Sequence, residues 1–311
     1  MQAFHTPILF LVFNRPDTTQ QVFDVLRKIK PTKLFIAADG PRLDKDAEKE
    51  KCIAVRRIAT QIDWECQLVT LFRDKNLGCG KAVSEAITWF FSHVEEGIIL
   101  EDDCLPCSSF FLFCSELLER YRDNEKIAHI SANNFQMGVQ RGNSDYYFSR
   151  YTHVWGWATW GRAWNDYDYK MAEYEKLKKN YPHKKLLPFG MMNAVKYESL
   201  DTWDVQWMYT NFLKDRLSIM PNINLVQNIG FTDDATHTRA SIPDYIKYSH
   251  SGELYFPLKH PVNIKANNKA DLFSAKTNFN INTIGFTQKI YRKLKSVLSK
   301  IYHYKLLGHE L

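Results

Sequence analysis

Three consecutive acidic residues, Glu101, Asp102 and Asp103, follow a short apolar run in the stretch EGIILEDDCLP at 96–106. Such a run is typical of a buried strand in a parallel sheet, and ligands of open α/β sheets bind outside the carboxyl ends of the strands. Neighbouring carboxylates repel one another, and a hard divalent cation that holds phosphate oxygens is a physical reason to gather them. The triplet therefore favours an Mg²⁺ or Mn²⁺ site, with a solvated acidic turn as the alternative.

Charged residues also follow the first two predicted strands. The apolar run 7–13 leads to Arg15, and the run 33–38 leads to Asp39 and Arg42. An arginine and a metal ion together can hold a diphosphate from two sides, which makes Arg15 a candidate phosphate ligand. The first strand is followed by neither GxGxxG nor GxxxxGK[ST], so the sequence lacks a dinucleotide fingerprint and a P-loop there.

The stretch WGWATWGRAW at 155–164 contains four tryptophans in ten residues. Aromatic faces pack well on the apolar faces of sugar rings, and glycine lets the backbone approach a ligand closely. We therefore expect Trp155, Gly156 and Trp157 to contact the sugar part of a ligand. For each single tryptophan the alternative is core packing.

A second group of carboxylates lies in the stretch LDTWDVQWM at 200–208. It opens a predicted helix that runs to about residue 213. Asp201 or Thr202 could cap this helix, which leaves Asp204 in the first turn, where the helix dipole favours a negative charge. Capping is the alternative to a chemical role for either aspartate.

The elements that must position these residues alternate along the chain. Each predicted strand is followed by a helical pattern, which predicts an α/β fold with a mostly parallel, doubly wound sheet, flanking helices and right-handed crossovers. A charged surface helix is expected within 167–188, and the pattern after residue 242 is weak. The predicted strands are 7–13, 33–38, 67–72, 98–100, 127–131 and 217–221, and the helices between them include 44–60, 82–91 and 110–121.

Composition limits the class of protein. The chain has 311 residues, 45% of them hydrophobic, and can bury a large core as one domain or as one domain with an added lobe. Its formal net charge of +6 is spread among interspersed acids and bases, so we expect no nucleic-acid partner. Six cysteines make no disulfide framework in a chain of this length. With no signal peptide and no membrane span in the sequence, a cytoplasmic protein is expected.

The last part of the chain differs from the rest. From 287 to 305 the apolar residues follow a helical stripe, basic residues occupy much of the remainder, and no acid interrupts them. This pattern predicts a basic amphipathic helix on an anionic membrane surface, on the cytoplasmic face of the inner membrane. The alternative is an ordinary helix docked on the domain.

Taken in order, these motifs resemble a known family. Strand-Asn-Arg-Pro, strand-Ala-Asp-Gly, strand-Glu-Asp-Asp, Trp-Gly-Trp, Trp-Asp and Thr-His-Thr are similar to the GT-A fold glycosyltransferases, in particular to a bacterial relative of N-acetylglucosaminyltransferase I, over about residues 5–240. The resemblance implies a GT-A domain at 1–240, with a nucleotide-binding half at about 1–132 and an acceptor half at about 133–240. An irregular extension at 241–286 and the helix at 287–311 follow it.

The resemblance also implies roles for single residues. Asp103 would bind the metal, Glu101 and Asp102 would face the ribose and the transferred sugar, Arg15 would lie near the diphosphate and Asp39 at the base, with UDP favoured. His237 is a candidate second metal ligand, with a loop hydrogen bond as the alternative. The catalytic base of the relatives lies in a Trp-Asp-Asp-Trp-Met run. The run at 203–208 is one residue longer, so Asp204 is the expected base and Asp201 its rival.

Sugar transfer from a nucleotide diphosphate needs the charge of the leaving group stabilised and the acceptor hydroxyl deprotonated. One acidic cluster and one separate aspartate meet both needs, which predicts an inverting, metal-dependent glycosyltransferase acting on a cell-surface glycan, a lipid-linked oligosaccharide or a lipopolysaccharide precursor. One alternative is a sugar-nucleotide nucleotidyltransferase, although that class would carry a glycine-rich loop after the first strand. The other is a glycan-binding module, which would not need the acids.

Overall fold

The structure, a computed structural model, describes residues 3–230, 243–248 and 251–281. The candidate metal ligand His237 and the predicted helix at 287–311 lie outside these residues. Within the described residues, every helix is too short or too polar to cross a bilayer.

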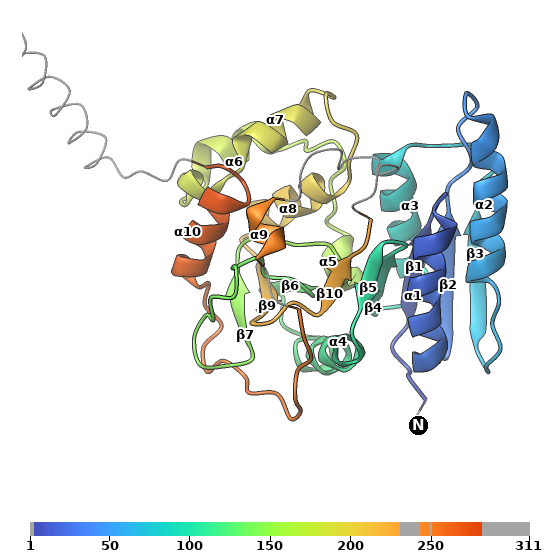
Figure 1. The fold of residues 1–311 in the computed structure, drawn as a ribbon. Coiled ribbons are helices and arrows are strands. Elements are labelled where there is room, and N and C mark those ends of the chain that lie inside the picture. Colours follow the sequence, from blue (N-terminus) through green and yellow to red (C-terminus); the bar gives the residue numbers. More distant parts are fainter. Residues whose placement is uncertain (1–2, 231–242, 249–250, 282–311) are drawn as a thin grey trace, which may run out of the picture.

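The described residues form one eight-stranded sheet with the order β3-β2-β1-β4-β8-β6-β9-β7 (Figure 1). β8 is antiparallel to both of its neighbours and β7 is antiparallel to β9, while every other pairing is parallel. The strands are β1 (Ile8–Val12), β2 (Lys33–Ala38), β3 (Gln67–Phe72), β4 (Glu96–Glu101), β6 (Ile127–Ser131), β7 (Tyr146–Ser149), β8 (Trp157–Trp160) and β9 (Leu217–Pro221). A separate two-stranded sheet pairs β5 (Cys104–Pro106) with β10 (Val226–Asn228).

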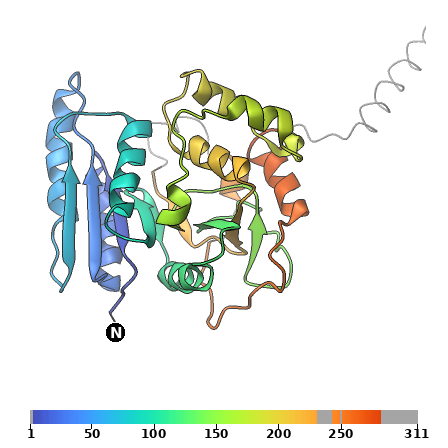
Figure 2. The same ribbon diagram turned by 180° about the vertical axis from the view of Figure 1, so that it is seen from behind.

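Helices cover both faces of this sheet (Figures 1 and 2). Alternate residues of β1 enter different apolar clusters: Ile8 and Phe10 pack with α1, α2 and α4, whereas Leu9 and Leu11 pack with α3 and with Trp207 of α8. The helices are α1 (Pro16–Ile29), α2 (Asp46–Ala59), α3 (Cys79–Phe91), α4 (Ser108–Arg120), α5 (Gly161–Trp164), α6 (Tyr174–Asn180), α7 (Phe189–Lys196), α8 (Asp204–Leu213), α9 (Asp244–Lys247) and α10 (Asn268–Thr277), with a short 3-10 turn η1 (Lys184–Leu186).

A further apolar cluster lies beside the β7 end of the sheet. It gathers Tyr147 of β7, buried residues of α6, α7 and α8, and Ala270 and Ala275 of α10. The extension that the sequence left without a pattern therefore contributes a helix to the core. Asp271 also fixes α10 to the sheet, because its side chain is fully buried and hydrogen-bonded to Ser149 and Arg150.

The α/β fold with a mostly parallel sheet is confirmed, and four predicted strands have the observed bounds: β2, β3, β6 and β9. The tryptophan-rich stretch is the main difference. Residues 157–160 form β8, which inserts antiparallel between β4 and β6. A four-residue strand that is buried on both faces shows no alternation of apolar and polar residues and is too short for a recognisable pattern, so its periodicity could not predict it.

Candidate functional site

The acidic triplet lies at the carboxyl end of β4, and Arg15 lies beside it. Only three residues, 13–15, connect β1 to α1, so the Arg15 side chain is held at the adjacent strand end. Its guanidinium bonds to both aspartates, with Nη2 2.5 Å from Asp102 Oδ1 and Nη1 2.9 Å from Asp103 Oδ2. The Phe13 backbone N–H donates to the other oxygen of Asp102 at 3.1 Å. The two terminal nitrogens of the Arg15 guanidinium therefore bind one aspartate each, so that a single cation pairs with both acids.

Burial and charge together set the protonation of this group. Burial works to lower the pKa of Arg15, but the charges of Asp102 and Asp103 raise it overall, so the guanidinium stays charged. Burial first, and then the charge of Asp103, raises the pKa of Glu101 to about 8. Burial likewise raises the pKa of Asp102, although Arg15 opposes the shift. One proton on Glu101 near neutral pH relieves the repulsion that three adjacent carboxylates would otherwise feel.

Gly230 closes over the acids and was not singled out from the sequence. The antiparallel pair of β5 and β10 carries the chain back over the triplet, where the Ile229 N–H donates to the Asp103 carbonyl at 2.8 Å. A Cβ on Gly230 would lie 2.3 Å from Asp103 Oδ2 and 2.7 Å from Arg15 Nη1. Only a glycine leaves room for this ion pair. This constraint comes from tertiary packing, so no local sequence motif predicts it.

The structure separates the two candidate bases. Asp201 Oδ1 accepts the Gly80 backbone N–H at 3.0 Å, so Asp201 caps α3 from a distant segment, whereas the sequence suggested that it caps α8. Asp204 is the first residue of α8 and accepts a hydrogen bond from the Thr202 hydroxyl. After burial and the charge of Asp103, the charge of Asp204 also contributes to the raised pKa of Glu101. Asp204 therefore lies within electrostatic reach of the triplet.

Asp39 and Arg42 are held by local partners. The Asp39 carboxylate accepts the backbone N–H groups of Leu77 and Gly40, each at 2.9 Å, and burial raises its pKa. Arg42 is paired with Glu48 of α2, which also accepts from Asn14 at 2.8 Å. Glu48 is only 5% exposed. The bond from Asn14 to Glu48 links α2 to the β1–α1 connection, and this non-local contact could not be expected from the sequence.

The tryptophans of the WGW stretch divide into two environments. Trp157 is fully buried and stacks on Trp203, with ring centroids 5.5 Å apart. The expectation that Trp157 contacts a sugar is corrected: it packs the core between β8 and α8. Gly156 has a φ of +66°, and a Cβ there would lie 2.6 Å from Val226 Cγ2, so its role is to let β10 approach. Trp155 is half-buried, packs edge-on against Phe135 and contacts the apolar cluster that β1, α1 and α4 share.

The donor atoms suit a metal that a phosphate ligand helps to bind. Among the described residues, no group of three or more His, Cys, Asp or Glu side chains is arranged to hold an ion by itself. Asp103 Oδ1 accepts only the weak Cys104 S–H bond at 3.4 Å, which leaves an oxygen for a cation. Mg²⁺ is commonly held by one or two carboxylates together with substrate phosphates. Asp103 fits that type of site, with the remaining ligands supplied by phosphate and water.

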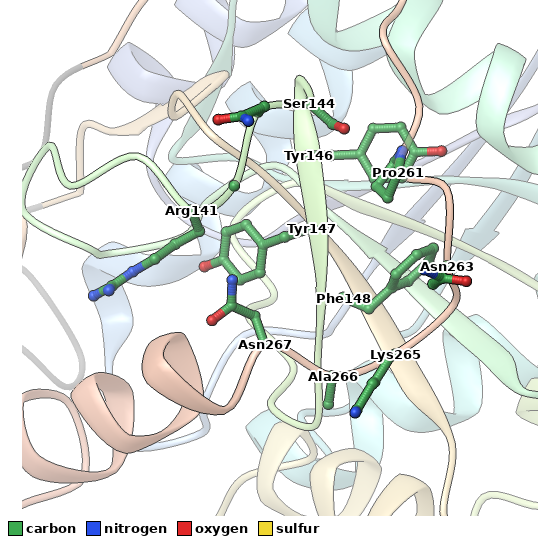
Figure 3. A pocket seen from close by; sticks show the side chains of 12 residues that line it. Arg141, Ser144, Tyr146, Tyr147, Phe148, Pro261, Asn263, Lys265, Ala266 and Asn267 are labelled. Atoms are coloured by element: carbon green, nitrogen blue, oxygen red, sulfur yellow. The ribbon is translucent and has the colours of Figure 1, made fainter.

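The structure thus brings Arg15, Glu101, Asp102, Asp103 and, at longer range, Asp204 to one edge of the sheet, with Asp39 at the end of β2. A pocket of about 250 Å³ lies elsewhere, between β7 and the segment 261–267 (Figure 3). No residue of the acidic triplet lines it.

No family model matches the chain, and no curated protein is similar enough to match it. Among solved structures, UDP-glucose pyrophosphorylase complexed with UDP-glucose is 10% identical, with a TM-score of 0.37 over 70% of this chain and 90% of that one. HddC from Yersinia pseudotuberculosis is 9% identical, with a TM-score of 0.31 over 58% of this chain and 81% of that one. The 4-diphosphocytidyl-2C-methyl-D-erythritolsynthase from Anaerococcus prevotii is 11% identical, with a TM-score of 0.29 over 68% and 99%. At these identities the likeness concerns the fold alone.

The first prediction concerns the close approach at Gly230. Gly230→Ala should lower the free energy of unfolding by about 1–3 kcal/mol, because the added methyl group displaces the Arg15–Asp103 pair. Urea denaturation followed by circular dichroism measures the change. The matched control is Gly190→Ala in α7, where a Cβ meets nothing within 4 Å and stability should stay equal or rise. Equal stability of Gly230→Ala and the wild type would contradict the packing described here.

The second prediction concerns pH. The folded protein holds the proton of Glu101 more tightly than the unfolded chain does, because its pKa rises from 4.5 to about 8. Its contribution to stability is therefore complete below about pH 4.5 and is lost as the pH rises towards 8. Glu101→Gln, which stays neutral, should show a flatter fall of unfolding free energy over that window. Parallel pH profiles of the two proteins in urea titrations would count against a protonated Glu101.

Proposed function

We propose that this protein is an inverting, metal-dependent glycosyltransferase that uses a nucleotide-diphosphate sugar, with a UDP-sugar favoured. The observation that carries the proposal is the meeting of two separate carboxylate groups at one sheet edge. The first is the triplet with Arg15 bonded to Asp102 and Asp103, and the second is Asp204 at the start of α8. Sugar transfer needs both a place for the diphosphate and a base apart from it.

Each residue of the triplet has a role in binding the donor. Arg15 turns its guanidinium towards the diphosphate, Asp103 offers its carboxylate to the metal, and Asp102 and Glu101 accept hydrogen bonds from the ribose and the transferred sugar. Asp39 holds the loop at Leu77 and faces the base. Trp155 covers the sugar with its indole ring. When bound, a divalent ion supplies positive charge against the leaving diphosphate.

Asp204 acts as the general base. The acceptor hydroxyl gives its proton to the Asp204 carboxylate as its oxygen forms the bond to the anomeric carbon, and the bond from that carbon to the diphosphate breaks with inversion. Asp201 is less suited to this work because its carboxylate already accepts the Gly80 N–H. The Thr202 hydroxyl, which donates to Asp204, orients the carboxylate.

A sugar-nucleotide nucleotidyltransferase is the second candidate, and UDP-glucose pyrophosphorylase, whose fold is similar, bears the name of such an enzyme. The connection from β1 to α1 argues for sugar transfer instead. It spans only residues 13–15, contains no glycine, and its arginine is bonded to the triplet. A glycan-binding module remains the third candidate. For the acceptor we favour a cell-surface glycan or a lipid-linked or lipopolysaccharide precursor, met at the cytoplasmic face of the membrane.

The third prediction tests the reaction class. Incubated with a panel of nucleotide sugars and Mn²⁺, the protein should slowly hydrolyse one donor to its nucleoside diphosphate without an acceptor. EDTA and Asp103→Asn should each reduce this hydrolysis and weaken donor binding in calorimetry, because both remove the metal link to the phosphates. Asp123→Asn, a change to an exposed acid after α4, is the control and should behave as the wild type.

Two results of that assay would overturn the proposal. Turnover that requires pyrophosphate and yields a nucleoside triphosphate would identify a nucleotidyltransferase. Glycan binding with no turnover of any donor would identify a binding module. Hydrolysis that EDTA leaves unchanged would remove the metal from the proposal and keep the sugar transfer.

The fourth prediction distinguishes Asp204 from Asp201 as the catalytic base. Asp204→Asn should leave donor binding nearly intact and lower turnover by a factor on the order of 10² or more, in line with general-base contributions. Asp201→Asn should keep turnover and cost about 1 kcal/mol of stability or less, because an asparagine can still accept the Gly80 N–H. Steady-state kinetics and urea denaturation of both variants make the comparison. The reverse pattern would move the base to Asp201, and normal turnover in both would remove the base assignment altogether.

A further inference from the structure

The segment 254–269, here called the strap, runs across the surface from the first turn of α4 into the first two residues of α10. It is fixed to the body of the protein at three points. The Leu254 N–H donates to Ser109 Oγ at 2.9 Å, the Lys259 N–H donates to the Asp145 carboxylate at 2.5 Å, and the Asn267 N–H donates to the Phe148 carbonyl at 2.7 Å. Figure 1 shows the strap in orange, extending past the strands at the lower end of the molecule. Its path is therefore defined by contacts with α4 and β7.

Large apolar side chains of the strap point into solvent despite these anchors. Val262 is 97% exposed and Tyr255 is 89% exposed, and Phe256 and Ile264 are 37% and 40% exposed. A fixed backbone that presents valine and tyrosine almost completely to water gains nothing from them in the isolated fold. Tyr255 and Phe256 are consecutive, and Val262 and Ile264 are two residues apart. A concentration of exposed apolar side chains in one short segment is typical of a surface that binds a partner.

The charge of the strap indicates what it binds. It carries Lys259, Lys265 and Lys269 and no acidic residue. In the described part of the chain none of these lysines has an ion-pair partner. Three carboxylates border the strap and keep their charge: Asp145 accepts the Lys259 backbone N–H, Glu253 accepts backbone N–H groups of α4, and Glu116 lies 3.2 Å from His260. Asp271 is paired with Arg150. The strap thus combines exposed apolar side chains with three lysines that make no ion pair among the described residues.

The pocket of about 250 Å³ lies beneath the strap, and basic and amide side chains contribute to its lining (Figure 3). Its outer wall is the strap from Pro261 to Ala266, and its inner wall is β7. Lys265, Asn263 and Asn267 supply one cation and two amides to its lining. Cationic and amide donors at the mouth of a small pocket suit phosphate oxygens.

We propose that the strap is a docking surface for an anionic phospholipid membrane. Val262, Ile264 and Tyr255 enter the headgroup region with their apolar side chains, while the three lysines meet lipid phosphates. Apolar insertion combined with attraction between basic side chains and anionic lipids is how peripheral proteins hold to a bilayer surface. The surface belongs to the described fold and is separate from the basic segment at 287–305.

The test is co-sedimentation of the full chain with vesicles of phosphatidylcholine alone and of equal parts phosphatidylcholine and phosphatidylglycerol. The wild type should bind the anionic vesicles, and binding should weaken with salt. Val262→Ser with Ile264→Ser should reduce the affinity about tenfold through lost insertion. Lys259→Gln, Lys265→Gln and Lys269→Gln together should reduce it on the order of 10²-fold, because each lysine near an anionic surface contributes about fivefold.

Matched controls use equally exposed residues of the other half of the protein. Leu43→Ser changes an apolar side chain that is 98% exposed, and Lys28→Gln, Lys33→Gln and Lys49→Gln remove the same charge from exposed positions. Both controls should bind vesicles as the wild type does, and all variants should keep the wild-type unfolding midpoint and donor hydrolysis. Because the vesicle assay needs no donor, its result is independent of the proposed transferase activity.

Three results would overturn the proposal. The first is that the wild type does not bind anionic vesicles. The second is that the strap variants bind these vesicles with the same affinity as the wild type. The third comes from light scattering: a wild-type dimer that Val262→Ser with Ile264→Ser turns into a monomer would show that a second copy covers the strap.

Discussion

The fork of hydrogen bonds from Arg15 to Asp102 and Asp103 is the interaction on which the rest of the site depends. Asp102 is almost completely buried, and a carboxylate in that position needs a bonded counter-charge to remain ionised. The requirement explains the neighbouring structure. A three-residue connection keeps Arg15 at the strand end, the Phe13 N–H satisfies the remaining Asp102 oxygen, and Gly230 gives the pair its space. A free-standing acidic turn would require none of these.

Segments far apart in the chain converge on this edge. Asp201 caps α3 across more than a hundred residues, β10 returns to pair with β5, and Trp203 stacks on Trp157 just before Asp204. The indole packing fixes the start of α8, so the position of Asp204 is set by the core. The WGW stretch therefore serves the site mainly by holding α8 in place, through the buried Trp157.

The sequence was sufficient for the elements whose periodicity is regular. Strands such as 33–38 and 67–72 are found where apolar runs and flanking helices predicted them, and the acids follow β4 as expected. The short buried strand β8 and the helix α10 escaped prediction because four residues carry no period and because α10 is amphipathic only weakly. Gly230, Glu48 and the cap by Asp201 escaped for another reason. Gly230, Asp201 and the Asn14 contact of Glu48 each depend on a partner more than thirty residues away in the sequence, and no local pattern encodes such contacts. Only the contact of Glu48 with Arg42 is local.

The antiparallel strand β8 has a mechanical consequence. It pairs with β4 on one side and with β6 on the other, so the two halves of the sheet are joined by continuous backbone hydrogen bonding. A hinge between the halves would have to break these hydrogen bonds in the middle of the core, where Trp157 and Ala158 are fully buried. Closure around a ligand by rocking of two rigid lobes is thus unavailable to this architecture. Any enclosure of a ligand must therefore come from the loops that connect the strands and helices at the edge of the sheet.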